Sequence, residues 1–462
     1  MADLRPGGQR NGTRATGNRA KVDEARLAAL DVLKAVRVDD AYTNLALAAA
    51  LQQHGLTGRD AAFVTELVSG TIRRRGTYDA ILAACVDRPL SKVEAKVLDA
   101  LRLGTHQLLS MRVPAHAAIS TTVDLVRAKV SSGAGGFANA VLRRVTEKDL
   151  SEWIERVAPD PAVAPTRYAS IAYSHPRWAV DELRSAVGAE ELYDLLAADN
   201  EAPRVTLVAR PGRSSREELP GTPTRYSPYG TVLEGGEPGQ VPAVAEGRAG
   251  VQDEGCQLVA MALAAAYVEG SDACWLDLCA GPGGKAALLG AVARTRGARL
   301  VAGELAPHRA RLVRRTAGPD ADVLVADGRV PPWREGAFDR VLLDAPCTGL
   351  GALRRRPEVR WRRTPDDVAP LVELQTALLD SALRSVRVGG VVAYVTCSPH
   401  SAETVGVVDP VADRDDVEVI PVAPLFPEVP GVARGAYGQL WPHRHGTDAM
   451  FMALLRRTGA TS

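Results

Sequence analysis

The sequence contains no hydrophobic run long enough to cross a membrane, and it has few cysteines for its length. Its longest nearly unbroken apolar run, Leu258 to Val268, is about half of what a membrane-spanning helix requires. The first 20 residues include four arginines and no apolar segment typical of a secretory signal peptide. Six cysteines in 462 residues do not form a disulfide scaffold. We therefore expect a cytoplasmic protein with reduced thiols, no membrane segment and a disordered basic tail over residues 1–20.

The composition excludes wholesale disorder, and the length excludes a single core. Apolar residues make up 46% of the chain and charged residues 24%, both near globular averages. At about 100 to 200 residues per domain, we expect two to four domains. The net charge of +1 hides an asymmetry, because residues 1–150 carry 22 Lys and Arg against 15 Asp and Glu. This excess indicates a polyanionic partner, usually RNA or DNA, although an arginine-rich soluble surface would give the same count.

Residues 21–150 show the periodicity of helices and almost no strand signals. Apolar residues recur at spacings of three and four, as in Leu27, Leu30, Leu33 and Val36. The pattern predicts an all-helical bundle. Near its end, SGAGGFANAVLRRV (132–145) leads from a glycine-rich turn into a helix that leaves Arg143 and Arg144 available to a partner. A turn before an ordinary core helix is the alternative for that stretch alone. The helical arrangement ending in GFANAVLRR resembles the NusB-like RNA-binding domain, which implies an RNA partner.

Residues 151–270 give weaker signals. An aromatic-rich stretch precedes a helix near Trp178, residues 203–210 have the pattern of a strand, and residues 251–267 have that of a helix. Periodicity does not distinguish a small α+β subdomain from an ordered linker. We assign this region as a connecting α+β subdomain.

In residues 271–459, buried-type strands alternate with helices. The predicted strands cover residues 273–279, 299–304, 321–327, 338–346 and 390–398, and the clearest helices cover residues 307–317 and 367–388. This alternation predicts an α/β fold with a doubly wound, Rossmann-like parallel sheet. Ligands of such sheets bind beyond the carboxyl ends of the strands.

Those strand ends carry most of the reactive side chains of this region. The first strand leads into Cys279, Ala280, Gly281, Pro282, Gly283, Gly284 and Lys285. Glycines allow a sharp turn and a close approach to a ligand, and the following helix offers its positive end. At the next two strand ends, Glu304 can accept both ribose hydroxyls of a nucleoside cofactor, and Asp327 can bind an adenine amine. A Gly-Pro-Gly-Gly order departs from the Gly-x-Gly-x-x-Gly of NAD sites and favours S-adenosylmethionine.

Cys347 and Cys397 follow two neighbouring strands beside this cofactor site. Carbon 5 of a pyrimidine is a weak nucleophile, but a thiolate that adds to carbon 6 makes it able to attack a methyl group. A nearby acid such as Asp344 can bind the base edge, and the base must be unpaired or flipped out. Inert core thiols and a redox pair are the alternatives, but a redox pair does not explain the glycine turn or the acids. Cys274 and Cys279 lack partners at ligand spacing, so we expect no metal.

Four motifs together resemble RNA cytosine-5 methyltransferases of the NOL/NOP/Sun family. They are DLCAGPGGK (277–285), DAPCTGLG (344–351), VTCSPHSAE (395–403) and WPHRHGTDAMFMALL (441–455), and VQDEGCQ (251–257) resembles the motif that precedes the catalytic domain. With the NusB-like region, the resemblance implies an S-adenosylmethionine-dependent enzyme that methylates a cytosine of small-subunit (16S) rRNA through a cysteine–carbon 6 adduct. A catalytically idle RNA-binding assembly factor is the alternative, and an NAD-linked oxidoreductase is disfavoured by the glycine spacing.

The resemblance also implies the residue roles. Cys397 matches the nucleophile and Cys347 the cysteine that helps to release the product; DNA cytosine methyltransferases use the Pro-Cys cysteine as nucleophile, so this choice rests on the resemblance alone. Residues 279–285, Glu304, Asp327 and Asp344 match cofactor positions, and Asp344 serves the cofactor, the base or both. Four positions depart from the family pattern: Glu304 replaces Asp, Thr404 replaces Asn, Cys256 replaces Ala or Ser, and Ala286 replaces Thr. None of these departures removes a reactive group.

An arginine-rich segment, residues 351–363, directly follows the Cys347 motif and holds six arginines against one glutamate. We expect Arg354, Arg355 and Arg356 to contact the RNA backbone and Trp361 to offer a stacking surface. A solvated charged loop is the alternative. The sequence shows no coiled-coil heptads, and we expect a monomer.

Overall fold

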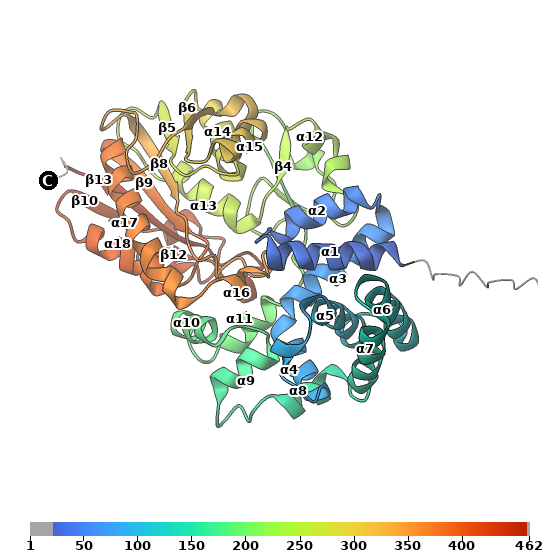
Figure 1. The fold of residues 1–462 in the computed structure, drawn as a ribbon. Helices are drawn as coiled ribbons and strands as arrows, with labels where there is room; N and C mark the ends of the chain where they lie inside the picture. Colours follow the sequence, from blue (N-terminus) through green and yellow to red (C-terminus); the bar gives the residue numbers. More distant parts are fainter. Residues whose placement is uncertain (1–21, 460–462) are drawn as a thin grey trace, which may run out of the picture.

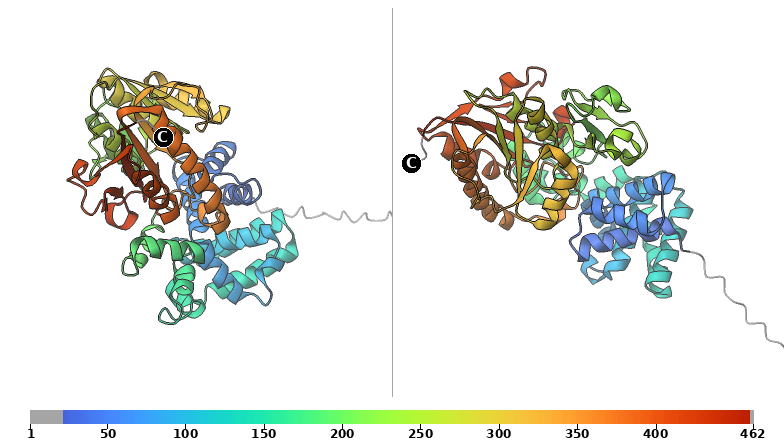
Figure 2. Two further views of the ribbon diagram at one scale, coloured as in Figure 1. Left: turned by 90° about the vertical axis from the view of Figure 1, so that its left-hand side faces the viewer. Right: turned by 90° about the horizontal axis from the view of Figure 1, so that it is seen from above.

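The computed structural model describes residues 22–459, so the tail predicted over residues 1–20 lies outside the described residues. A helical bundle, a connecting region and a sheet domain follow one another along the chain (Figure 1). The bundle contains α1 (Glu24–Val38), α2 (Thr43–Gln53), α3 (Gly58–Arg73), α4 (Arg75–Cys85), α5 (Ala95–Leu109), α6 (Ala115–Lys129) and α7 (Ser132–Val145). Figure 2 shows the bundle beside the sheet domain.

Side-chain caps and an apolar interior define the bundle. Asp23 precedes α1 and accepts a hydrogen bond from the Arg26 N–H at 2.8 Å, and Ser131 caps α7 in the same way. Such caps satisfy N–H groups that a helix leaves without partners. The core includes Leu30, Leu33, Leu67, Leu101 and Leu142, all buried. Each buried aliphatic side chain contributes about 1.5–3 kcal/mol, so the apolar faces seen in the sequence stabilise this bundle.

The connecting region combines short helices with a small antiparallel sheet. Its helices are α8 (Leu150–Val157), α9 (Pro165–Ala172), α10 (Arg177–Val187), α11 (Leu192–Ala198), α12 (Pro242–Ala245) and α13 (Glu254–Ala265). The strands are β1 (Thr206–Ala209), β2 (Thr222–Pro223), β3 (Gly230–Val232) and β4 (Ala249–Val251), in the order β2-β3-β1-β4. The sequence pattern indicated only β1, because the other strands have two or three residues and lie among prolines and glycines.

The sheet domain has a parallel core with an antiparallel edge. The core strands are β5 (Cys274–Asp277), β6 (Arg299–Glu304), β7 (Asp322–Val325), β8 (Phe338–Asp344) and β9 (Val386–Thr396), in the order β7-β6-β5-β8-β9. The edge strands are β10 (Val417–Ile420), β11 (Ala433–Arg434), β12 (Tyr437–Gln439) and β13 (Phe451–Arg457). The predicted α/β class is confirmed, and the five predicted strands form the parallel core, whereas the antiparallel edge beyond β9 was not predicted. There β13 runs antiparallel to β9, and such a pairing needs no crossover helix.

Helices cover both faces of this sheet. They are α14 (Gly284–Thr295), α15 (Pro307–Ala317), α17 (Val368–Ser385) and α18 (Val405–Ala412), with α13 of the connecting region. Two short helices of this part of the chain lie elsewhere: α16 (Val359–Arg362) contacts the bundle, and α19 (Pro442–His445) contacts α11. Trp275 and Leu276, neighbours in β5, belong to different apolar clusters: Trp275 packs with residues of α13 and α14, and Leu276 with residues of α17 and α18. Among residues 22–459, no helix combines the length and apolar character that a bilayer span requires.

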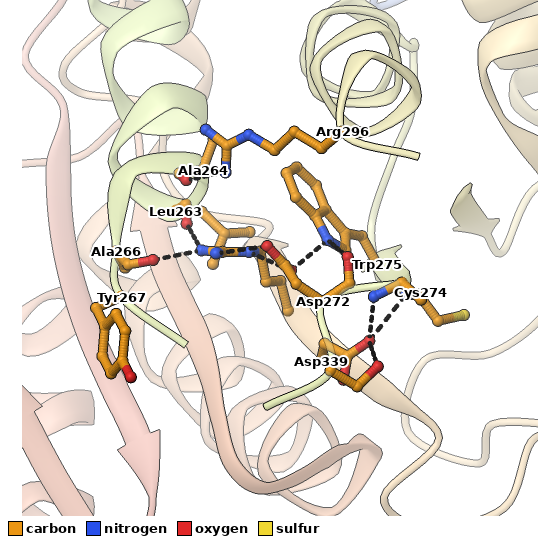
Figure 3. A network of polar contacts seen from close by, with 12 residues as sticks. Leu263, Ala264, Ala266, Tyr267, Asp272, Cys274, Trp275, Arg296 and Asp339 are labelled. Atoms are coloured by element: carbon orange, nitrogen blue, oxygen red, sulfur yellow. Dashed lines mark hydrogen bonds and ion pairs between the residues drawn. The ribbon is translucent and has the colours of Figure 1, made fainter. Parts of the chain in front are cut away.

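A polar network fixes the end of α13 against the strands. The carbonyl groups of Leu263 and Ala266 and the carboxylate of Asp272 converge on the guanidinium of Arg340, at 2.5–2.8 Å (Figure 3). Arg296 donates to the Ala264 carbonyl at 2.6 Å. Carbonyl groups in the last turn of a helix have no partner within the helix. These two arginines supply the missing donors, and they anchor α13 to β8 through Arg340 and to the end of α14 through Arg296.

Candidate active site

The turn between β5 and α14 contains the glycines predicted to hold a cofactor. A Cβ atom at Gly281 would lie 2.1 Å from Glu304 Oε2, and Gly283 has a φ of +111°, which side chains disfavour. Pro282 is exposed between them, and α14 begins at Gly284. The turn therefore brings free backbone N–H groups and the positive end of a helix to the carboxyl ends of the strands.

Two acids flank this turn, in different environments. Glu304, at the end of β6, is buried and accepts hydrogen bonds from the N–H groups of Gly281 at 3.1 Å and Ala306 at 3.0 Å. Asp327 lies just beyond β7, and its carboxylate is bound by Arg329 with a shortest distance of 2.7 Å. Hydrogen bonding to Arg329 lowers the pKa of Asp327. Glu304 is thus fixed beside the glycine turn, whereas the contact of Asp327 with adenine stays a prediction.

A buried acid that the sequence analysis did not assign lies at the end of β5. Neither carboxyl oxygen of Asp277 has a hydrogen-bond partner among the described residues. Burial, and next the negative charge of Asp344, raise the pKa of Asp277 to about 8, so this group is protonated at neutral pH and can donate a hydrogen bond. Burial also raises the pKa of the nearby Cys279 thiol. Ala280 extends the strand edge by donating to the Gly303 carbonyl at 2.9 Å.

An ion pair joins the glycine turn to β8. Lys285 Nζ lies 2.7 Å from Asp344 Oδ2, and the Lys285 side chain is 13% exposed. Burial favours the neutral amine, but the charge of Asp344 outweighs this effect, and the pKa of Lys285 is raised. Lys285 is therefore a positive charge beside the two cysteine loops.

The two cysteines expected to react lie together. The Cys347 and Cys397 sulfur atoms are 3.4 Å apart. Hydrogen bonding with Cys347 lowers the pKa of Cys397, and the charges of Lys285 and Arg356 act in the same direction. Hydrogen bonding with Cys397, followed by burial, raises the pKa of Cys347. The pair is therefore asymmetric, with the pKa of Cys397 lowered and that of Cys347 raised.

A buried carboxylate connects the loops of these cysteines. Glu403 accepts hydrogen bonds from the backbone N–H of Thr348 at 2.7 Å, from the Ser398 hydroxyl at 2.6 Å and from the Gln375 amide at 3.1 Å. It lies within the VTCSPHSAE motif, but the sequence analysis gave it no role. Its position in that motif is the one sequence signal that could have indicated a role. Its hydrogen-bond partners belong to three segments that are separate in sequence, so the network could not be predicted.

The three arginines predicted to contact RNA differ in their surroundings. Arg354 is buried and donates to the Gly446 carbonyl at 2.9 Å. Arg355 forms an ion pair with Asp448 at 2.5 Å. Arg356 is exposed, and its guanidinium carbon lies 5.6 Å from the centre of the Tyr42 ring. The charges of Arg354 and Arg355 are engaged inside the protein, so Arg356 is the one of these three that is open to a partner.

Residues 358–362, called the joint segment below, enter the helical bundle and the connecting region. Glu358 accepts a hydrogen bond from the Thr43 hydroxyl at 2.7 Å. Arg360, which is fully buried, donates to the carbonyl groups of Arg73 (3.0 Å), Ser174 (3.2 Å) and Asp199 (2.6 Å) and to the Asn200 side chain (2.7 Å). Trp361 donates to the Ile72 carbonyl at 3.0 Å and packs against the bundle core. Trp361 is thus partly buried against the bundle, and its stacking on RNA stays a prediction.

The remaining predicted RNA contacts lie in the bundle. Arg143 and Arg144 are exposed on α7, and Arg144 donates to the Cys85 carbonyl at 3.0 Å. The structure does not bring them together with the cysteines and the glycine turn. Over the part of the chain that the structure describes, no group of three or more His, Cys, Asp or Glu side chains has the arrangement of a metal site.

Comparison with known proteins identifies the family. Residues 23–147 match the NusB family, and residues 263–456 match the family described as 16S rRNA methyltransferase RsmB/F. The ribosomal RNA small subunit methyltransferase B of Pseudomonas syringae is 32% identical over 455 residues, covering 94% of this chain and 97% of that protein. The chain belongs to the RsmB/F family of 16S rRNA methyltransferases. The cofactor of this RsmB/F methyltransferase is S-adenosylmethionine.

Other relatives extend the likeness of this RsmB/F methyltransferase over its whole length. The Mycobacterium tuberculosis protein Rv1407 is 51% identical over 447 residues, covering 95% of this chain and 98% of that protein. The crystal structure of PH0851 superposes with a TM-score of 0.74 at 20% identity and covers 95% of this chain and 99% of that one. NSun6 from Pyrococcus horikoshii gives a TM-score of 0.52 at 18% identity and covers 62% of this chain and 99% of that one. At these identities, the two structures show a shared fold.

Proposed function

We propose that this protein transfers a methyl group from S-adenosylmethionine to carbon 5 of a cytosine in 16S rRNA. The observation that carries the proposal is the pair of Cys347 and Cys397 sulfur atoms, 3.4 Å apart, beside the Lys285–Asp344 ion pair. Family membership supports methyl transfer, and the thiol pair supports carbon 5. A ring nitrogen or an amine attacks a methyl group directly, whereas carbon 5 first requires covalent activation by a nucleophile.

The residues around the glycine turn fit the cofactor. An ionised carboxylate has about four acceptor positions, so Glu304 keeps room for ribose hydroxyls beside its backbone donors from Gly281 and Ala306. Glycine at positions 281 and 283 lets the turn pack closely against Glu304 and α15, because a Cβ would lie 2.1 Å from Glu304 Oε2 at the first position and 2.9 Å from the Val313 Cα at the second. Residues 279–285, Glu304, Asp327 and Asp344 form the proposed cofactor site. When bound, S-adenosylmethionine supplies an electrophilic methyl group.

In this proposal Cys397 is the nucleophile. Its lowered pKa favours the thiolate, which adds to carbon 6 of the cytosine while the electrons of the 5,6 double bond move to carbon 5. Carbon 5 then takes the methyl group. Asp344 and Lys285 lie where they can hydrogen-bond the base edge and stabilise its charge. Transfer of the carbon 5 proton to water restores the double bond and expels the Cys397 thiolate, and we assign Cys347 to assist this release by hydrogen bonding to the departing sulfur.

RNA contacts are proposed at three arginines. Arg356 is exposed near the cysteine pair, and Arg143 and Arg144 are exposed on the bundle. Each can bind a phosphate, and their separate positions allow one RNA to contact both domains. We propose that the protein does this as a monomer.

A trapping experiment tests the proposal. Wild type, Cys347→Ala and Cys397→Ala proteins are incubated with S-adenosylmethionine and unmodified 16S rRNA, and a denaturing gel then separates any covalent protein–RNA complex. Carbon-5-methylated cytosine is mapped in parallel. Cys85→Ala is the matched control, because this thiol is buried in the bundle.

The outcomes are distinct. The proposal predicts that Cys347→Ala accumulates a covalent complex, and that Cys397→Ala forms neither complex nor product. The inverse pattern would exchange the roles of the two cysteines. A wild-type protein that binds RNA but never methylates it would refute the catalytic proposal in favour of a role in ribosome assembly.

A further inference from the structure

Glu403 lies where the two cysteine-bearing loops meet. Its side chain is fully buried, and its acceptors bind Thr348, which directly follows Cys347, and Ser398, which directly follows Cys397. Gln375 of α17 donates both to Glu403 at 3.1 Å and to the Pro346 carbonyl at 2.8 Å. The residues on both sides of Cys347 are therefore held by one network centred on a single carboxylate.

The charge of this carboxylate requires an explanation. No Lys, Arg or His pairs with Glu403 among residues 22–459, and its hydrogen-bond donors are neutral groups. A buried charge without a cation costs more than a buried amide. A neutral side chain could form hydrogen bonds to both loops at a lower desolvation cost. These hydrogen bonds alone therefore do not explain why an acid occupies this position.

We propose that Glu403 is a positioning residue for the cysteine pair, which holds the two thiols in contact and uses its negative charge to keep Cys347 in the neutral form. This inference rests on the proposed function, in which Cys397 reacts as the thiolate. Charged groups that act on Cys397 include Asp344, Lys285 and Arg356, and those that act on Cys347 include Asp344 and Glu403. Glu403 accepts the backbone N–H of Thr348 at 2.7 Å, so its negative charge lies beside the Cys347 loop and raises the pKa of Cys347.

Two variants of Glu403 separate the effect of its charge from the effect of its side-chain length. Glu403→Gln keeps the length and removes the charge, whereas Glu403→Asp keeps the charge but is too short to reach both loops. Glu418→Gln is the control, because Glu418 is exposed on β10 and pairs with Arg456. The alkylation rates of Cys347 and Cys397 by iodoacetamide are measured against pH on the full-length protein without RNA or cofactor, each site being resolved by mass spectrometry.

In wild type, Cys397 should react faster than Cys347 near neutral pH. In Glu403→Gln, the ratio of the two rates should fall about tenfold, which corresponds to one unit of relative pKa. Glu403→Asp should keep the alkylation preference better than Glu403→Gln, yet lose methyl transfer to RNA because the loops separate. Glu418→Gln should match wild type in both assays.

An unchanged ratio and full methyl transfer in Glu403→Gln would overturn the inference. If that variant does not fold, Ser398→Ala and Thr348→Val each remove one hydroxyl donor to Glu403, and full methyl transfer to RNA in both would contradict the positioning role. A wild-type protein that does not methylate cytosine would refute the proposed function. The alkylation test could still be interpreted in that case, because it needs no RNA.

Discussion

Replacing Arg360 with alanine should destabilise the protein strongly, although Arg360 lies in a segment that looks solvent-exposed by composition. The guanidinium is fully buried and donates to four acceptors in the bundle and the connecting region. Removing one partner of a buried charged network costs about 3–5 kcal/mol, since the groups left behind stay buried. At about 2–4 °C per kcal/mol for a domain of this size, Tm should fall by about 6–20 °C.

The stability lost in Arg360→Ala should also depend on pH, because Asp199 titrates near neutral pH. Burial raises the pKa of Asp199 to about 7, while the charge of Arg360 opposes this rise. An acid whose pKa is higher in the folded state stabilises that state at low pH, and this contribution is lost as pH rises through the folded pKa. Without Arg360 the pKa of Asp199 rises further, because an opposing positive charge is gone. The stability difference between wild type and Arg360→Ala should therefore grow from pH 6 to pH 8.5.

Scanning calorimetry across that pH range measures both effects. Arg363→Ala is the matched control, because Arg363 is partly exposed and pairs with Asp367 at 3.4 Å, an interaction worth about 0–1 kcal/mol. A Tm for Arg360→Ala within about 2 °C of wild type, equivalent to about 1 kcal/mol or less, would refute the reasoning. A stability difference that shrinks with rising pH would refute the part assigned to Asp199.

Two further predictions concern the ligand sites. Gly281→Ala should weaken S-adenosylmethionine binding in calorimetric titration, because its Cβ would lie 2.1 Å from Glu304 Oε2 and would displace that carboxylate, whereas Gly136→Ala in the bundle meets no atom within 4 Å and should bind normally; equal affinity in the two variants would contradict the cofactor site. Arg356→Ala should weaken RNA binding and reduce the salt slope by about 0.7–0.9 for one lost phosphate contact, as measured by filter binding across a salt series. Unchanged affinity at every salt concentration would remove Arg356 from the RNA site.

The catalytic half of the fold could be predicted because its signals are local. The strand β6 and the helix α15 have the predicted bounds, 299–304 and 307–317, since a buried apolar run and an N-terminal proline mark them in the sequence. The edge strands β11 and β12 were not predicted, because they have two and three residues and pair with strands defined only by the tertiary fold. Short strands do not carry enough residues to show a period.

The candidate site could also be predicted only where its residues belong to local sequence motifs. The motifs indicated Lys285, Asp344 and the two cysteines, and the structure brings these residues together. The arginine-rich segment misled the sequence analysis, because six arginines in 13 residues are typical of a solvated surface. The carbonyl groups that bind Arg360 belong to residues 160 to 287 positions away in the chain, so no local pattern could reveal them.

The joint segment has a consequence for dividing the protein into parts. Two domains linked only by a flexible chain can be cut apart or exchanged with those of a relative, each keeping its own stability. Here a cut after residue 150 would expose Trp361 and leave Arg360 and Glu358 without their partners at Arg73 and Thr43. The catalytic half is therefore not an independent module. A chimera that carries a foreign bundle would have to inherit the carbonyl and hydroxyl groups that receive residues 358–362.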